Sequence, residues 1–235
     1  MRLAQFITGN LEQILVEWEA FAASLLAPGH VMTPRAAPLN AARRINFSAA
    51  KMDAMINDLL EYTRTRLGRE IPVSLEPASM EQICRIAFDE IRAAYPERIF
   101  QLETSGELEG RFDSARLQQV LSNLLNNAVQ HGNASLPITL SAHGEPDRIT
   151  LSVKNYGEPI PAGQLQVIFN SLVQIPSPAA ALHSGGSPST SLGLGLYIAR
   201  EIVAMHGGTI VAESSDRDGT VFSARLPRRA SGARA

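Results

Sequence analysis

From about residue 73 onward, the chain alternates between helical and strand patterns, and this alternation limits the folds that it can adopt. The segment RITLSVKN alternates apolar and polar residues at Ile149, Leu151 and Val153, which is typical of a half-buried strand. We expect helices at 78–94, 113–131, 162–169 and 193–206, and strands at 98–104, 137–143, 148–154, 208–213 and 219–226. The last two strands flank SSDRDG and should pair antiparallel. The pattern predicts an α+β fold, a two-layer α/β sandwich with a mixed sheet and helices on one face.

Composition excludes several classes of protein. Hydrophobic residues make up 45% and charged residues 19% of the 235 residues, as in globular proteins. A net charge of −2 gives no reason to expect a nucleic-acid surface. The only cysteine, Cys84, lies in an amphipathic pattern, so we predict a core position and no internal disulfide. No apolar run reaches the roughly 18–20 residues of a membrane span. We therefore expect a soluble, cytoplasmic protein.

Two helical segments precede the alternating region. Residues 10–27 place apolar side chains at helical spacing, and residues 27–40 contain three prolines and read as a linker. A second helix is expected at about 41–67, where Ile45, Met52 and Leu59 repeat every seven residues. This repeat is compatible with a helical hairpin, with a dimeric bundle or with a single core-facing helix.

Gly193 and Gly195 stand at the start of a helical pattern in SLGLGLYIAREIVAMHGGTI. Glycine costs roughly 0.5–1 kcal/mol of backbone entropy relative to alanine, so something should require it there. Backbone amides at a helix N-terminus bind anions such as phosphate, although tight packing of the helix on the sheet is an alternative explanation. The Pro-, Ser- and Gly-rich stretch between Phe169 and Gly193 is expected to form a mobile lid or, alternatively, an inert insertion.

Two further motifs place asparagines at conspicuous positions. In RLQQVLSNLLNNAVQHGN, Asn123 and Asn127 are four residues apart and share a helix face. The neutral side-chain oxygens of these asparagines are suitable ligands for a hydrated Mg²⁺ bound to nucleotide phosphates. Alternatively, the two side chains simply face solvent. In VKNYGEPIP, Asn155 ends a strand, where it either points at a ligand or forms an Asx-type turn. The expected buried stripe of the first motif comprises Leu117, Val120, Leu121, Leu124, Leu125 and Ala128.

The order and spacing of these motifs resemble the ATP-binding domain of sensor histidine kinases, in the GHKL ATPase superfamily. LQQVLSNLLNNAVQHGN resembles the N box, VKNYGEPIP the Asp-x-Gly-x-Gly box, and QVIFNSLVQ the F box. SLGLGLYIAREIVAMHGGTI resembles the G2 box, DGTVFSARLP the closing Gly-Thr hairpin, and MINDLLEYTRTRLG the end of the dimerisation hairpin. The resemblance covers about residues 41–228.

The resemblance implies ATP and Mg²⁺ as cofactors and a role for each motif residue. Asn127 would ligate Mg²⁺, with Asn123 and His131 near the phosphates. Asn155 would meet the adenine amino group. The remaining residues implied in nucleotide binding are Gly157, which would support Asn155, Thr220 close to the base, Phe169 of the F box, and Gly193, Leu194, Gly195 and Leu196 of the phosphate loop. A response regulator is the implied partner protein, with a homodimer or a partner kinase contacting the helical region.

Two positions and one missing motif depart from the family pattern. The family usually has Asp at the position of Asn155, and a neutral amide should weaken adenine binding by about 1 kcal/mol. Pro159 replaces a second glycine and should stiffen the loop. The phosphoacceptor box is missing, because the first hairpin helix has no counterpart; His30, ahead of Thr33-Pro34, is a weak acceptor candidate.

The resulting domain prediction has four parts: a truncated sensory-like region and linker (1–38), a second-helix remnant of a dimerisation hairpin (39–70), the ATP-binding catalytic domain (71–228) and a disordered tail (229–235). The leading function is a histidine kinase that passes a phosphoryl group to a response regulator. The alternatives are a nucleotide-binding pseudokinase or trans-acting half-kinase, and, less favoured, a serine kinase of the anti-sigma-factor type.

Overall fold

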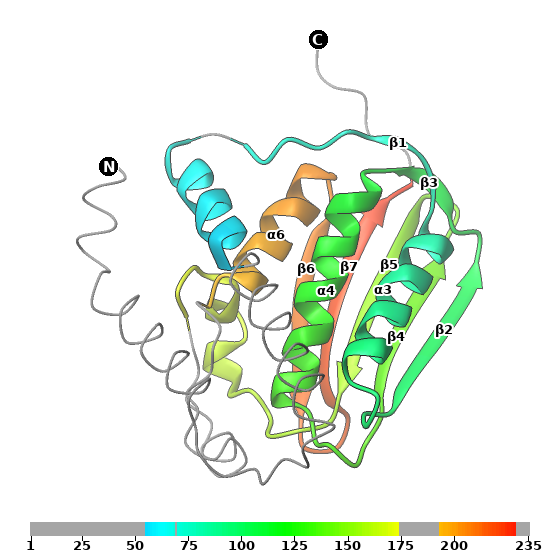
Figure 1. The fold of residues 1–235 in the computed structure, drawn as a ribbon, viewed down its shortest axis with the longest axis vertical. Coiled ribbons are helices and arrows are strands. Elements are labelled where there is room, and N and C mark those ends of the chain that lie inside the picture. The colour runs from blue at the N-terminus through cyan, green and yellow to red at the C-terminus, as the bar shows by residue number, and fades with distance from the viewer. Residues whose placement is uncertain (1–54, 69, 174–192, 229–235) are drawn as a thin grey trace, which may run out of the picture.

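A five-stranded mixed sheet forms one of the two layers of the fold (Figure 1). The computed structural model describes residues 55–68, 70–173 and 193–228. The strand order is β2-β4-β5-β7-β6, with β2 parallel to β4 and the other neighbours antiparallel. The strands are β2 (Phe100–Gly106), β4 (Ile138–Gly144), β5 (Arg148–Asn155), β6 (Thr209–Ser215) and β7 (Gly219–Pro227). The predicted strands and the antiparallel β6–β7 pair are confirmed.

Three helices, α3 (Met80–Ala94), α4 (Ser114–His131) and α6 (Gly195–Met205), cover one face of this sheet (Figure 1). The middle helix, α4, packs against both of the others. Its buried residues are Leu117, Val120, Leu121, Leu124, Leu125 and Ala128, which confirms the predicted stripe. The two-layer sandwich with helices on one face is therefore confirmed.

Two side chains fix the start of α4. Asp113 caps the helix by accepting a hydrogen bond from the Arg116 backbone amide at 3.1 Å. The backbone amide of Asp113 donates to Nε2 of the buried His206, at the end of α6, at 3.1 Å. His206 Nδ1 lies 2.8 Å from the Ile202 carbonyl oxygen and donates to it, because Nε2 is the accepting nitrogen. The beginning of α4 is thus tied to the end of α6.

Two elements differ from the sequence-based expectation. Strands β1 (Glu76–Ser79) and β3 (Glu109–Phe112) form a separate antiparallel pair that the pattern does not predict. The expected helix at 162–169 is wrong: the chain forms two 3-10 turns, η1 (Ala162–Gln164) and η2 (Val167–Phe169). Eight residues containing Gly163 are too few to stabilise an α-helix, and the buried Ile168 and Phe169 anchor the second turn instead.

The described part of the predicted 41–67 helix is helical over residues 55–66. Cys84 is fully buried in the core, as predicted, and burial raises the pKa of its thiol to about 12. Within the described residues, no helix has the length and apolar character needed to cross a bilayer. The predictions for the helix at 10–27, the linker, His30, the stretch 174–192 and the tail fall outside the described residues.

Candidate functional site

One polar face of α4 carries the side chains that the sequence motif singles out. Asn123, Asn127 and His131 follow one another at intervals of four residues, so they line a single face. At 1.5 Å per residue this face extends about 12 Å along the helix axis. Asn123 and Asn127 are half-buried, and their neighbour Asn126 is exposed. The predicted shared face of the two asparagines is therefore present.

The first of these side chains contacts the start of α6. Asn123 Nδ2 donates a hydrogen bond to the Gly195 carbonyl oxygen at 3.0 Å. Gly195 is the first residue of α6, and Leu194, the residue before it, is buried while Leu196 is half-buried. The contact places the Gly193–Leu196 segment beside one end of the polar face of α4.

The structure explains the glycine at position 193 but not the one at position 195. Gly193 has φ +65°, and a β-carbon there would lie 2.8 Å from the Val173 carbonyl oxygen. Its own carbonyl oxygen accepts from the Leu172 amide at 3.1 Å. The backbone alone therefore requires glycine at 193. At Gly195 the nearest described atoms to a β-carbon would be those of the Asn123 side chain, at 3.4 Å and beyond, an ordinary contact distance. The neighbouring atoms therefore do not require glycine at 195.

Asn155 ends β5 at the other end of the polar face. It is 3% exposed and lies opposite Thr220 of β7, which is 4% exposed. Among the described residues, the structure gives the side-chain amide of Asn155 no hydrogen-bond partner. In the described part of the chain, the buried side-chain atoms without a hydrogen-bond partner are Arg98 Nε and Gln164 Oε1, so the Asn155 amide keeps access to solvent. An accessible amide without a protein partner is compatible with a hydrogen-bonding ligand.

A hydroxyl pair lies beside Asn155 and was missed by the sequence analysis. Ser214 Oγ and Thr220 Oγ1 are 2.6 Å apart, and Ser214 Oγ accepts from the Ile160 amide at 2.9 Å. Ser214 thereby connects the loop after β5 to the β6–β7 hairpin. The only sequence signal for it was its position as the first residue of SSDRDG, near the end of β6.

Glycines close the gap between α4 and the end of β5. Gly132 and Gly157 form an isolated β-bridge, and the Asn133 amide donates to the Tyr156 carbonyl oxygen. A β-carbon at Gly157 would collide with the His131 carbonyl oxygen. Gly157 thus supports Asn155 by letting the end of α4 approach the chain directly after β5.

His131 and Phe169 have separate environments. His131 keeps an exposed surface, yet the surrounding protein desolvates its ring and lowers the pKa of the imidazole below its ordinary value. Phe169 is buried, with its ring edge-on to Phe222 at a centroid distance of 6.1 Å. Phe169 therefore packs in the core.

The residues present are compatible with a magnesium ion carried by a nucleotide. The described residues contain no group of three or more His, Cys, Asp or Glu that could form a protein-only metal site. Mg²⁺ in nucleotide sites usually takes one or two protein oxygens and completes its shell with phosphates and water. Asn127, half-buried and without a side-chain partner among the described residues, offers one such oxygen.

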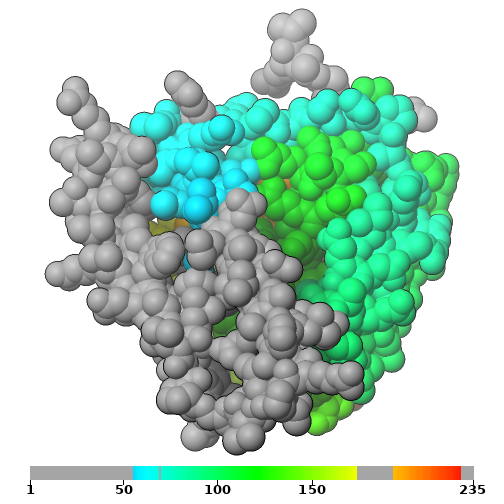
Figure 2. Space-filling view, in the orientation of Figure 1, coloured from blue at the N-terminus to red at the C-terminus, as the bar shows by residue number. Residues whose placement is uncertain are grey.

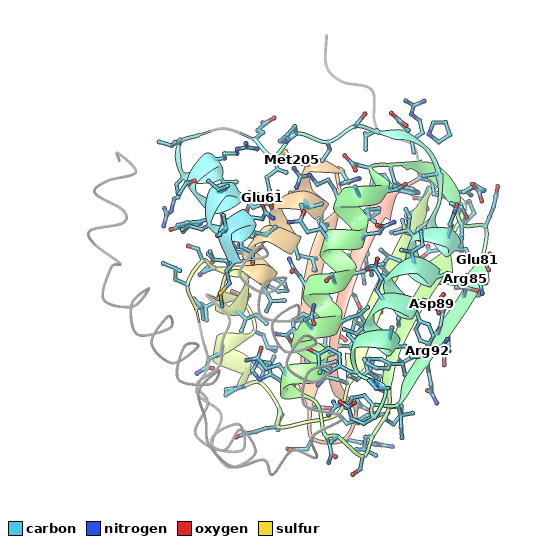
Figure 3. The ribbon with its side chains drawn as sticks, in the orientation of Figure 1. Glu61, Glu81, Arg85, Asp89, Arg92 and Met205 are labelled. Atoms are coloured by element: carbon cyan, nitrogen blue, oxygen red, sulfur yellow. The ribbon has the colours of Figure 1, made fainter. Side chains whose placement is uncertain are left out.

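The helix at 55–66 docks against the start of α4 through a polar cluster that the sequence analysis missed. Arg116 Nη1 donates to Glu61 Oε1 and to Gln119 Oε1, the latter at 2.9 Å. Gln119 Nε2 donates to Glu61 Oε2 at 2.9 Å, and Glu61 is 8% exposed. Figure 2 shows this segment lying against α4, and Figure 3 labels Glu61 on it.

The same helix contacts α6 through aromatic side chains. The rings of Tyr62 and Tyr197 meet edge-on at a centroid distance of 5.6 Å. The Tyr197 hydroxyl donates to Thr65 Oγ1 at 3.0 Å. Tyr197 lies two residues after Gly195, so the 55–66 helix reaches the start of α6 as well as the start of α4.

Comparison with known proteins gives the family. The family model for histidine kinase-, DNA gyrase B- and HSP90-like ATPases matches residues 112–230. The chain belongs to this ATPase family. It is 31% identical over 183 residues to the alginate biosynthesis sensor protein KinB of Pseudomonas aeruginosa, covering 76% of this chain and 29% of that protein. It is also 30% identical over 192 residues to the signal transduction histidine-protein kinase AfsQ2 of Streptomyces coelicolor, covering 80% of this chain and 33% of that protein.

Solved structures agree with this assignment. The catalytic domain of histidine kinase ThkA is 26% identical, with a TM-score of 0.56, over 66% of this chain and 97% of that domain. The complex of ThkA with response regulator protein TrrA has a TM-score of 0.66 at 20% identity, over 96% of this chain and 63% of that chain, a likeness of fold. The chain spans about a third or less of the two sensor kinases named above.

Proposed function

We propose that the chain binds Mg-ATP along the polar face of α4, with the base at Asn155 and the phosphates at the start of α6. The Asn155 side-chain amide ends β5 with no hydrogen-bond partner among the described residues and with access to solvent, and this observation carries the proposal. Its oxygen would accept a hydrogen bond from the adenine amino group, and Thr220 would lie beside the base. Gly157 would act indirectly, by holding the end of α4 against the loop after β5.

The phosphates would lie at the other end of the same face. The backbone amides of Gly193, Leu194, Gly195 and Leu196 open α6, where amides and the helix dipole favour an anion. Asn123 would fix this segment through its hydrogen bond to Gly195. Asn127, midway between the two ends, would supply a ligand oxygen for Mg²⁺, and the ion would neutralise charge on the phosphates.

The reaction that fits this site is transfer of the γ-phosphoryl group to a histidine and then to a response regulator. Such transfer depends on positioning and on charge stabilisation, which the α6 amides and the α4 asparagines would provide. A neutral imidazole is the required nucleophile. His30 is the weak acceptor candidate of this chain, within a proposed 1–38 region that precedes the hairpin remnant (39–70) and the catalytic domain (71–228).

The second candidate is a nucleotide-binding pseudokinase or a trans-acting half-kinase. This candidate follows from the expectation that no segment of the given residues matches the family's acceptor box. The polar docking of the 55–66 helix on α4 would then serve to transmit nucleotide binding to a partner kinase or to a second copy of the chain.

The two candidate functions differ in whether a labelled phosphoryl group from ATP becomes attached to a histidine of the protein. Purified protein incubated with γ-labelled ATP and Mg²⁺ should acquire an acid-labile, alkali-stable label if it phosphorylates a histidine. The label should be lost in Asn127→Ala and retained in Asn126→Ala, because the exposed Asn126 only donates within its own helix, to the Ser122 carbonyl oxygen. Nucleotide binding without label would support the pseudokinase or half-kinase. A label that survives Asn127→Ala would count against the proposed site.

A further inference from the structure

Arg98, just before β2, places its guanidinium at the C-terminal end of α4. Nη2 donates to the carbonyl oxygen of Gly132, the residue that caps this helix, at 3.2 Å. The last carbonyl oxygens of a helix lack intrahelical partners and carry partial negative charge, so a cation is favourable there. Arg98 therefore holds Gly132 from outside α4.

Gly132 is also the point where Arg98 and Asn155 meet. A β-carbon placed at Gly132 would lie 3.1 Å from Arg98 Nη2 and 3.3 Å from the Asn155 β-carbon. Gly132 further forms the β-bridge to Gly157, two residues beyond Asn155. A shift of Gly132 would therefore displace the side chain of Asn155 and the loop that follows it.

Holding the Arg98 guanidinium in this position costs the hydration of one of its nitrogen atoms. Arg98 Nε is buried and has no hydrogen-bond partner among the described residues. Buried unpaired donors are rare in native proteins because each one loses its hydration without compensation. Capping a helix end would not require it, since a lysine could place one charge there without a buried Nε. The planar guanidinium offers instead a fixed direction of approach to Gly132.

We propose that Arg98 is a positioning residue for the end of the site where Asn155 would contact the adenine base. By holding the Gly132 carbonyl oxygen it sets the position of the Asn155 amide and so the preference for adenine over other bases. This inference rests on the proposed function, because it assigns Arg98 to the same nucleotide site.

The test measures base preference as well as affinity. Displacement of a fluorescent ATP analogue by ATP and by GTP, each with Mg²⁺, gives two affinities for each variant. Arg98→Met should weaken ATP binding about fivefold, the loss of one hydrogen-bonded contact, and leave GTP within about twofold. The ATP-to-GTP preference should therefore fall. Arg92→Met is the matched control, because Arg92 lies on α3 with 63% of its side chain exposed (Figure 3). It should change neither affinity.

The outcomes separate this inference from the proposed function. Wild-type protein that displaces no analogue would overturn both. Wild-type protein that binds, together with an unchanged ATP-to-GTP preference in Arg98→Met, would overturn the inference alone, even if the melting temperature falls. If Arg98→Met does not fold, Arg98→Lys is judged by the same ratio, because lysine lacks the planar fork and should also reduce the preference.

Discussion

The side-chain amide of Asn123 donates to the carbonyl oxygen of Gly195 at 3.0 Å. This bond joins the polar face of α4 to the first residue of α6. In the proposed site it would hold the phosphate end in position before a nucleotide binds. Preorganisation of this kind reduces the entropy lost on binding.

Alanine at each of the two glycines should have opposite effects on stability. Gly195→Ala fits the available space and should keep or raise the free energy of unfolding, by up to about 1 kcal/mol. Gly193→Ala should lower it by about 1–3 kcal/mol, because of its φ of +65° and the nearby Val173 carbonyl oxygen. Urea unfolding measures both changes.

The Gly195→Ala variant should also have a lower affinity for nucleotide. Affinity for Mg-ATP should fall at least about tenfold although the fold is intact, because the new methyl group would occupy the approach to the α6 amides. Normal ATP binding by this stable variant would show that close approach is not the reason for glycine at 195.

Asn155→Asp introduces the carboxylate that the family pattern usually has at this position. A charged acceptor should strengthen the hydrogen bond to the adenine amino group and tighten ATP binding by about 1 kcal/mol, roughly fivefold. The same change should lower the melting temperature of the nucleotide-free protein, because position 155 is 3% exposed and the new charge would be buried there. Calorimetric titration and thermal unfolding measure the two effects. Equal ATP affinity in the two proteins would argue against a base contact at 155.

The sequence predicted the local elements well and the distant contacts poorly. The helix expected at 113–131 is α4, Ser114–His131, because its apolar stripe and its Asp113 cap are both local signals. The β1–β3 pair was missed, since each strand has four residues and Pro77 interrupts the pattern. Asn155 could be placed at a strand end, but nothing local shows that Thr220 lies opposite.

The polar cluster at the start of α4 illustrates the same limit. Glu61 and Arg116 are separated by 55 positions in the sequence, and no periodicity links them. A charged residue in an amphipathic helix is usually predicted to face solvent, and only the docking of the 55–66 helix on α4 buries Glu61.

Removing one partner of this cluster should weaken the docking. Glu61→Gln removes the charge that Arg116 contacts, and the largely buried pair should lose about 1–3 kcal/mol of unfolding free energy. Glu81→Gln is the control, because the Glu81–Arg85 pair lies on the exposed side of α3 (Figure 3) and should contribute less than about 0.5 kcal/mol. Urea unfolding compares the two variants, and equal losses would mean that the cluster does not stabilise the docked helix.

Asp58 makes the stability of the docked helix depend on pH. Burial, and then the charge of Glu61, raise the pKa of the Asp58 carboxyl from 3.8 to about 7. The folded protein then binds more protons than the unfolded chain between these values, so this contribution to stability is present at low pH and is lost as pH rises through about 7.

Asp58→Asn should remove that dependence. The variant should be more stable than the wild type at pH 8, by roughly 1–2 kcal/mol for a half-buried and partly screened group, and the difference should shrink toward pH 5. Unfolding free energies measured from pH 5 to 8 give the comparison. A difference that is constant with pH would mean that Asp58 titrates normally.

The central claim is that α4, β5 and the start of α6 form one site for Mg-ATP, and calorimetric titration of the protein with ATP and Mg²⁺ tests it most directly. We expect saturable binding of one nucleotide per chain, weakened at least about tenfold in Asn127→Ala and unchanged in Asn126→Ala. Absence of binding to the folded wild-type protein, or equal losses in the two variants, would contradict the account.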